Sequence, residues 1–187
     1  MKKETKVLLH SNNIWVLAEG MLGPLFAIFA ERIGGDILDI SWAWATYLIM
    51  MGILVITMGD ISDKKGFSKE KMMVWGYSLN AIFTFCYLFV QNPTQLFVVQ
   101  GGLGVAAAFT IPTWNALYAK YEDKRHGGFV WGLATGEAQI VGGLAIIIGG
   151  FIVNSFSFTA LFIVMGVIQT AAAIYQSQIL FITKRTK

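Results

Sequence analysis

The chain has 187 residues, of which 56% are hydrophobic and only 13% charged, with a formal net charge of +3. Soluble domains carry roughly 25% charged residues, and here the apolar residues form long blocks with a mean hydropathy of +0.62. These values exclude an ordinary soluble domain and predict an integral membrane protein. The single cysteine, Cys86, excludes an internal disulfide framework, and His10 and His126 lie too far apart for a ligand cluster. We therefore expect no cofactor, no metal and no nucleic-acid partner.

The N-terminal segment "MKKETK" followed by apolar residues could begin a secretory signal. Glu19 and Pro24 interrupt the apolar run from 14 to 30, which is also too long and lacks a convincing cleavage site. We interpret this run as a retained first transmembrane helix.

Six segments are long and apolar enough to cross a bilayer, which takes about 20 residues each. They form one predicted domain over residues 1–187, with spans at about 13–32, 37–58, 71–91, 95–119, 129–153 and 157–181. The runs are about twice as long as a membrane β-strand, so the predicted fold class is all-α rather than a barrel.

The orientation follows from the basic residues, which concentrate on the cytoplasmic side of membrane proteins. With the N-terminus inside, all Lys and Arg residues except Arg32 fall in inner segments. Both termini are therefore expected in the cytoplasm, and Trp42 and Trp44 in the outer aromatic belt. The predicted location is the plasma (inner) membrane, as a multi-pass protein.

A charged stretch, "GDISDKKG", joins the second and third predicted helices. Gly59, Asp63, Lys64 and Gly66 have the spacing of a motif, Gly-x-Leu-Ala-Asp-Arg/Lys-x-Gly. Gly59 would permit a close helix approach, and Gly66 the positive φ of a tight turn. The alternative interpretation is a solvated loop that only determines topology.

Six helices with this loop motif resemble one half of a major facilitator superfamily transporter. The resemblance implies two inverted three-helix repeats and alternating access. It implies that Asp63 latches the cytoplasmic side and that Lys64 pairs with Glu122 or Asp123.

The predicted fourth and fifth helices extend the resemblance. "QGGLGVAAAFTIPTWNALYAKY" is similar to a stretch of drug-exporter-like branches, although Phe97 replaces the arginine of many proton-coupled members. The fifth helix resembles that of antiporters but lacks its proline; its glycines at 136, 143 and 150 predict a seam for close packing. Pro24 and Pro112 predict kinks in the first and fourth helices.

Two acidic residues lie within the predicted spans, Glu19 and Glu137, both expected near mid-membrane at similar depth. A charge there costs about 2.5–3.5 kcal/mol even on insertion scales, so each indicates a proton carrier or a counter-charge for a cationic substrate. The alternative is a protonated Glu that bonds a neighbouring helix. Secondary cavity candidates are Gln100, Asn115, Asn80 and Gln139.

The resemblance covers only half of a twelve-helix transporter, whose halves are parallel and hold the substrate between them. A second copy could supply the missing half, so we predict a parallel homodimer exporting lipophilic or cationic compounds, with proton coupling. Open alternatives are a hetero-dimer, a non-transporting scaffold, or a fragment of a twelve-helix protein, although "TKRTK" resembles a finished tail. No motif of an intramembrane enzyme is found.

Overall fold

The computed structural model describes residues 2–64, 66–122 and 124–185, and this part of the chain is helical and contains no strand. Five helices are each long and apolar enough to span a membrane, and the bent pair α1–α2 makes a sixth span when counted as one. The elements in chain order are α1 (Lys3–Leu22), α2 (Leu25–Arg32), α3 (Ile37–Lys64), α4 (Lys69–Cys86), η1 (Tyr87–Phe89), α5 (Pro93–Tyr121), η2 (Lys124–His126), α6 (Gly127–Ser155) and α7 (Phe158–Arg185).

The first span bends by 49° between α1 and α2. The break falls at Gly23 and Pro24, where Pro24 stands immediately before α2. Proline lacks a backbone N–H and its ring clashes with the preceding turn, so it cannot continue α1. The predicted kink at Pro24 is present. Pro112 lies inside α5, which is one uninterrupted helix.

The first helix begins at Lys3, ten residues before the predicted span. Its first turns are polar but packed: the Thr5 hydroxyl donates to the Tyr121 carbonyl over 3.0 Å. The Trp114 indole nitrogen donates to the Leu8 carbonyl over 3.2 Å. These contacts to α5 hold the start of α1 in the bundle, which hydropathy alone could not predict.

The charged stretch after the second predicted span is mostly helix rather than loop. α3 continues to Lys64, so Gly59, Asp60 and Asp63 lie in its last turns. The chain then reverses at Gly66, which has a φ of +62°, the left-handed conformation that glycine adopts without a steric cost. Ser68 caps the start of α4 by accepting a hydrogen bond from the Lys71 N–H.

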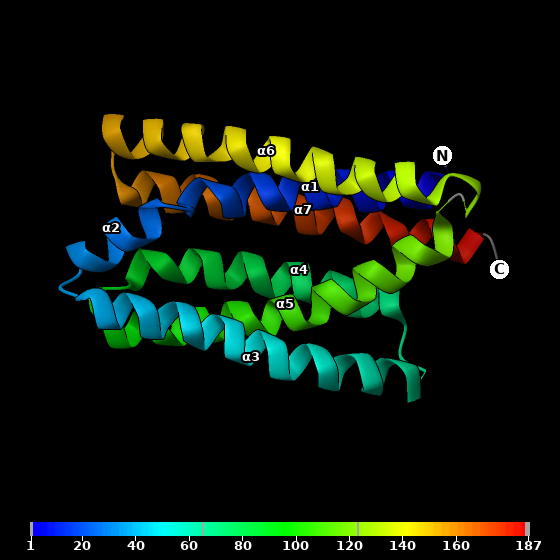
Figure 1. Ribbon diagram of the computed structural model, residues 1–187, viewed down its shortest axis with the longest axis horizontal. Helices are drawn as coiled ribbons and strands as arrows, with labels where there is room; N and C mark the ends of the chain where they lie inside the picture. Colours follow the sequence, from blue (N-terminus) through cyan, green and yellow to red (C-terminus); the bar gives the residue numbers. More distant parts are fainter. Residues whose placement is uncertain (1, 65, 123, 186–187) are drawn as a thin grey trace.

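The helices pack as two linked groups. α1 lies against α6 and α7, α5 lies against α3 and α4, and α4 joins α7. Figure 1 shows α6 along one edge and α3 along the opposite edge, with the other helices between them. Both chain ends lie at the end of the bundle that carries the α3–α4 and α5–α6 connections (Figure 1), here called the terminal end.

The two edge helices are almost bare. Only 6% of the apolar window of α3 and 11% of that of α6 are buried within the chain, against 61% for α5. α6 contacts α1 through Gly149, where a Cβ atom would collide with the Met21 carbonyl. The predicted seam at 136, 143 and 150 does not pack in this chain, because a Cβ at any of these glycines meets open space. The surface of α6 that contacts α1 lies on another side of the helix and includes Gly142, Ala145 and Gly149.

Candidate functional site

A pocket of about 120 Å³ lies at the bend of the first span. Four elements besides α1 contribute to it, because the bend at Gly23 moves α2 away from the axis of α1 and exposes the Glu19 side chain. The lining residues are Glu19, Leu22, Gly23, Phe26, Trp44, Tyr47, Tyr87 and Gln100.

The Glu19 carboxyl is held from behind by amides. The Gln169 side-chain nitrogen on α7 donates to it over 3.3 Å, and the Asn80 amide on α4 lies within hydrogen-bonding reach. Neutral donors of this kind orient the carboxyl and stabilise its charge without cancelling it. The amides therefore hold the Glu19 carboxyl in a fixed orientation at the edge of the pocket.

The rest of the pocket wall is aromatic. Phe26 and Trp44 have ring centroids 5.7 Å apart, and those of Trp44 and Tyr47 are 5.6 Å apart. On the other side, the Gln100 amide donates to the Tyr87 hydroxyl over 3.2 Å. Aromatic faces and a carboxylate both attract a cation, and aromatic faces bind cations that are weakly hydrated. The arrangement suits an apolar cation better than an anion or a sugar.

The structure brings together only some of the predicted site residues. Gln100 joins Glu19 in the pocket. Asn115 is exposed and lines a separate hollow of about 190 Å³ with Asn12 and Trp114. Gln139 is exposed on α6.

The second acid, Glu137, is not level with Glu19 as expected. Its carboxylate accepts a hydrogen bond of 2.7 Å from Asn13, and Asn13 precedes Glu19 by six residues, about 9 Å along the helix. The difference arises because α1 begins at Lys3, ten residues before the predicted span, so Glu19 lies farther from the start of its helix than Glu137 does from the start of α6 at Gly127. Glu137 is thus bound to α1 and does not line the Glu19 pocket.

Sequence reasoning missed the aromatic wall of the pocket, including Phe26, and the Gln169 amide behind Glu19. Trp44 was assigned to the interfacial belt, and Tyr47, Tyr87 and Gln169 were not singled out. Gln169 is an isolated amide in the apolar run of α7, a signal that could have found it. The tyrosines carried no such signal.

The charged stretch makes different ion pairs from those the resemblance implied. Lys64 contacts Asp60 at 2.9 Å, one turn back on α3, and Asp63 contacts Lys69 at 2.7 Å. Lys64 is therefore not paired with Glu122, because α3 continues as a helix and presents an acid four residues away. Asp123 lies outside the described residues.

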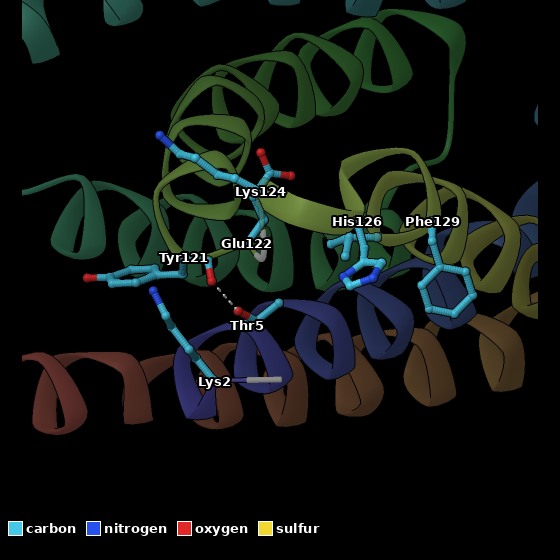
Figure 2. Close-up of a pocket in the computed structure, with 8 residues that line it drawn as sticks. Lys2, Thr5, Tyr121, Glu122, Lys124, His126 and Phe129 are labelled. Carbon is cyan, nitrogen blue, oxygen red and sulfur yellow. Dashed lines mark hydrogen bonds between the residues drawn. The ribbon is translucent and has the colours of Figure 1, made fainter.

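A larger hollow of about 570 Å³ lies at the terminal end, between the start of α1 and the α5–α6 connection. Figure 2 shows the Thr5–Tyr121 hydrogen bond, with Glu122, Lys124 and His126 around it. Its lining mixes Lys2 and Lys124 with Glu122, so the charges favour no single class of ligand. In the described part of the chain, His, Cys, Asp and Glu side chains form no group that could hold a metal ion.

Comparison with protein families decides the identity of the fold. The family model described as Major Facilitator Superfamily matches residues 12–187. The chain belongs to the major facilitator superfamily. Membership in this superfamily, together with the apolar helices, points to a multi-pass membrane protein.

Relatives within the superfamily are distant. An uncharacterized MFS-type transporter of Methanocaldococcus jannaschii, MJ1560, is 24% identical over 93% of this chain and 45% of its own length. The multidrug resistance protein MdtG of Dickeya zeae is 26% identical over 81% of this chain and 38% of its own. The chain thus spans less than half the length of these superfamily relatives.

A solved structure shows the same fold. The POT family transporter PepTSo superposes with a TM-score of 0.73 at 9% identity, over 94% of this chain and 37% of its own. At this identity the likeness concerns the superfamily fold alone.

Proposed function

We propose that this chain is a half-size secondary transporter that moves apolar cations across the membrane, in exchange for protons, by alternating access. The observation that carries the proposal is the Glu19 carboxyl in an aromatic pocket at the bend of the first span. The negative charge of the acid would attract a lipophilic cation, and the faces of the surrounding aromatic rings would contact it. These rings belong to Phe26, Trp44, Tyr47 and Tyr87. The relatives named multidrug resistance protein MdtG support a compound of this kind.

Alternating access requires a bundle with internal repeats that can rock as units. The packing in this chain is consistent with two inverted repeats, α1–α4 and α5–α7. Exchanging α1 with α5, α3 with α6 and α4 with α7 leaves the set of main helix contacts unchanged. The strong bias of Lys and Arg towards the terminal end supports termini that face the cytoplasm.

The second half of the transporter is proposed to be another copy of the chain, in a parallel two-fold dimer. The bare faces of α3 and α6 support this, as do the open glycines 136, 143 and 150 on α6. A hetero-dimeric partner, or a following half in a longer chain, would use the same faces. In each case the Glu19 pocket would lie near the shared cavity.

Proton exchange is proposed because the same carboxyl can hold either a proton or the cation. Loading the cation would release the proton, and reprotonation would release the cation on the other side. Glu137 is a weaker candidate for this role, because it is bonded to Asn13 on α1 and does not line the aromatic pocket.

The test is uptake of tetraphenylphosphonium, an apolar cation, into proteoliposomes under a pH gradient. Glu19→Gln removes the charge and keeps the shape, so uptake should fall to background. Glu31→Gln, on the exposed face of α2 in the same bent span, should transport normally. Unchanged, pH-dependent uptake by Glu19→Gln would overturn the proposal.

A further inference from the structure

Behind the Glu19 pocket, polar side chains line the contacts that α7 makes with α1 on one side and α4 on the other. They are almost fully buried: four have no exposed surface and Asn80 has 3%. This set, here called the polar seam, comprises Ser11, Tyr77, Asn80, Gln169 and Gln176.

The two ends of the polar seam are at different depths. Gln169 and Asn80 meet the Glu19 carboxyl, whereas Ser11 donates a hydrogen bond to the Gln176 side-chain oxygen nearer the terminal end. Ser11 and Glu19 are eight residues apart on α1, about 12 Å. Tyr77 on α4 lies near Ser11.

Three polar atoms of the seam have no hydrogen-bond partner in the described structure. They are the Tyr77 hydroxyl, the Gln169 side-chain oxygen and the Gln176 side-chain nitrogen. Buried polar atoms in proteins are nearly always bonded, and water molecules satisfy those that side chains leave over. Three such atoms between the same helices therefore indicate water between them.

We propose that ordered water molecules fill the polar seam and conduct protons between Glu19 and the terminal end of the bundle. The proposal rests on the proton exchange proposed above. It gives Glu19 two separate sides: the cation reaches it from the aromatic pocket between α2, α3 and α5, and the proton through the polar seam.

The chemistry of the relay is balanced. The hydroxyls of Ser11 and Tyr77 each accept one proton while releasing another, as does each water, and the amides of Gln169 and Gln176 only hold the water in place. One proton leaves solution and one joins a Glu19 oxygen, with no other bond changed. The exit to solution is the next contact between the same helices, where the exposed His10 ring meets the Tyr175 hydroxyl at 3.3 Å.

The other polar groups near Glu19 either line the cation pocket or lie at another level, so the polar seam is the route that we assign to the proton. Tyr47 of α3 and Tyr87 of η1 face it from the pocket side, and Gln100 of α5 is bonded to Tyr87. On α6 the acid is Glu137, which is bound to Asn13 at another level. The seam lies on the opposite side, formed by α4 and α7.

Water in the seam can be detected without transport. X-ray radiolysis of the protein in lipid nanodiscs generates hydroxyl radicals from bound water, which label adjacent side chains. Tyr77 and Tyr118 are both fully buried, but the Tyr118 hydroxyl is already bonded to the Val130 carbonyl over 2.7 Å. We expect labelling of Tyr77 and none of Tyr118; equal lack of labelling would overturn the proposal.

Transport then tests conduction. Tyr77→Phe removes one hydroxyl and Gln176→Met one amide, with little change of shape. Each should slow pH-driven tetraphenylphosphonium uptake by about tenfold, the effect on a rate of losing one ordinary hydrogen bond, while exchange at equal pH stays unchanged. Gln178→Met, on the exposed side of α7, is the control.

The two proposals fail differently. Equal loss in pH-driven uptake and in equal-pH exchange would overturn the relay, because it would indicate a packing defect. A wild-type chain that labels at Tyr77 but transports no cation would contradict the proposed function and leave the water in the seam established.

Discussion

The side-chain amide of Asn13 in α1 donates a 2.7 Å hydrogen bond to the carboxylate of Glu137 in α6, joining helices 124 positions apart in sequence. Of the two long helices that pack against α1, α6 is the less buried: 11% of its apolar window is covered within the chain, against 39% for α7. The pair therefore serves as a specific polar tie in an apolar contact.

Replacing Asn13 with Leu should leave the half-buried Glu137 carboxylate without its donor. The expected loss is about 1–3 kcal/mol of stability, seen as a lower unfolding temperature in detergent by tryptophan fluorescence. Glu137→Gln keeps an acceptor for Asn13 and should lose much less. Equal destabilisation by the two variants would contradict a role for the bond.

Gly149 and Gly150 form a matched pair for testing the α1–α6 contact. A Cβ at Gly149 would collide with the backbone of Met21, whereas one at Gly150 meets open space. Gly149→Ala should cost about 1–3 kcal/mol through overpacking. Gly150→Ala should leave the stability of the single chain unchanged or slightly raised, because alanine favours helix. Thermal unfolding of both variants checks the prediction, and a stable Gly149→Ala protein would refute this packing.

The turn at Gly66 should depend on glycine. Its φ of +62° costs an L-residue roughly 1–2 kcal/mol, so Gly66→Ala should reduce stability or shift the start of α4. Gly59→Ala, in the helical part of the same stretch and facing open space in this chain, should not. If Gly59 instead contacts a second half, Gly59→Ala will lower transport without lowering the unfolding temperature of the single chain.

Asp63 has a local partner, Lys69, and an implied role as a latch. If only the ion pair matters, Asp63→Asn and Lys69→Gln should have equal and small effects, since exposed pairs contribute about 0–1 kcal/mol. We expect Asp63→Asn alone to impair transport while expression stays normal. Equal transport by both variants would exclude the latch.

The dimer can be tested on the open face of α6. Wild-type protein in detergent should have twice the 20.6 kDa mass of one chain, measured by light scattering with correction for bound detergent. Gly143→Leu should shift it to the monomer, whereas Ala171→Leu on the exposed face of α7 should not. A monomeric wild type, or dimers unaffected by Gly143→Leu, would contradict this interface.

Sequence alone was sufficient for the features that depend on local chemistry. Long apolar blocks predicted the five helices that could each span a membrane, and the bent pair that makes a sixth when counted as one. The ring of Pro24 predicted the break in that pair, and Gly66 predicted the left-handed turn. The pocket was predicted only in part: a carboxyl at position 19 is conspicuous in an apolar run, and so Glu19 and Gln100 were found.

The remaining features depend on which helices meet. Lys64 pairs with Asp60 because α3 continues through a stretch that resembles a loop. Gln169 reaches Glu19 because the middle of α7 packs against α1, and Tyr87 reaches the pocket from the η1 turn that follows α4. Hydropathy and spacing contain no information on such contacts between distant parts of the chain.

The placement of both described chain ends at the terminal end of the bundle (Figure 1) has a genetic consequence. The end of one unit and the start of the next lie on the same side of the membrane, so two copies could be joined head to tail by a short polar linker. Such a tandem gene product would keep both units parallel, with no additional crossing of the bilayer. Each copy could then mutate separately, and a symmetric site could become an asymmetric one.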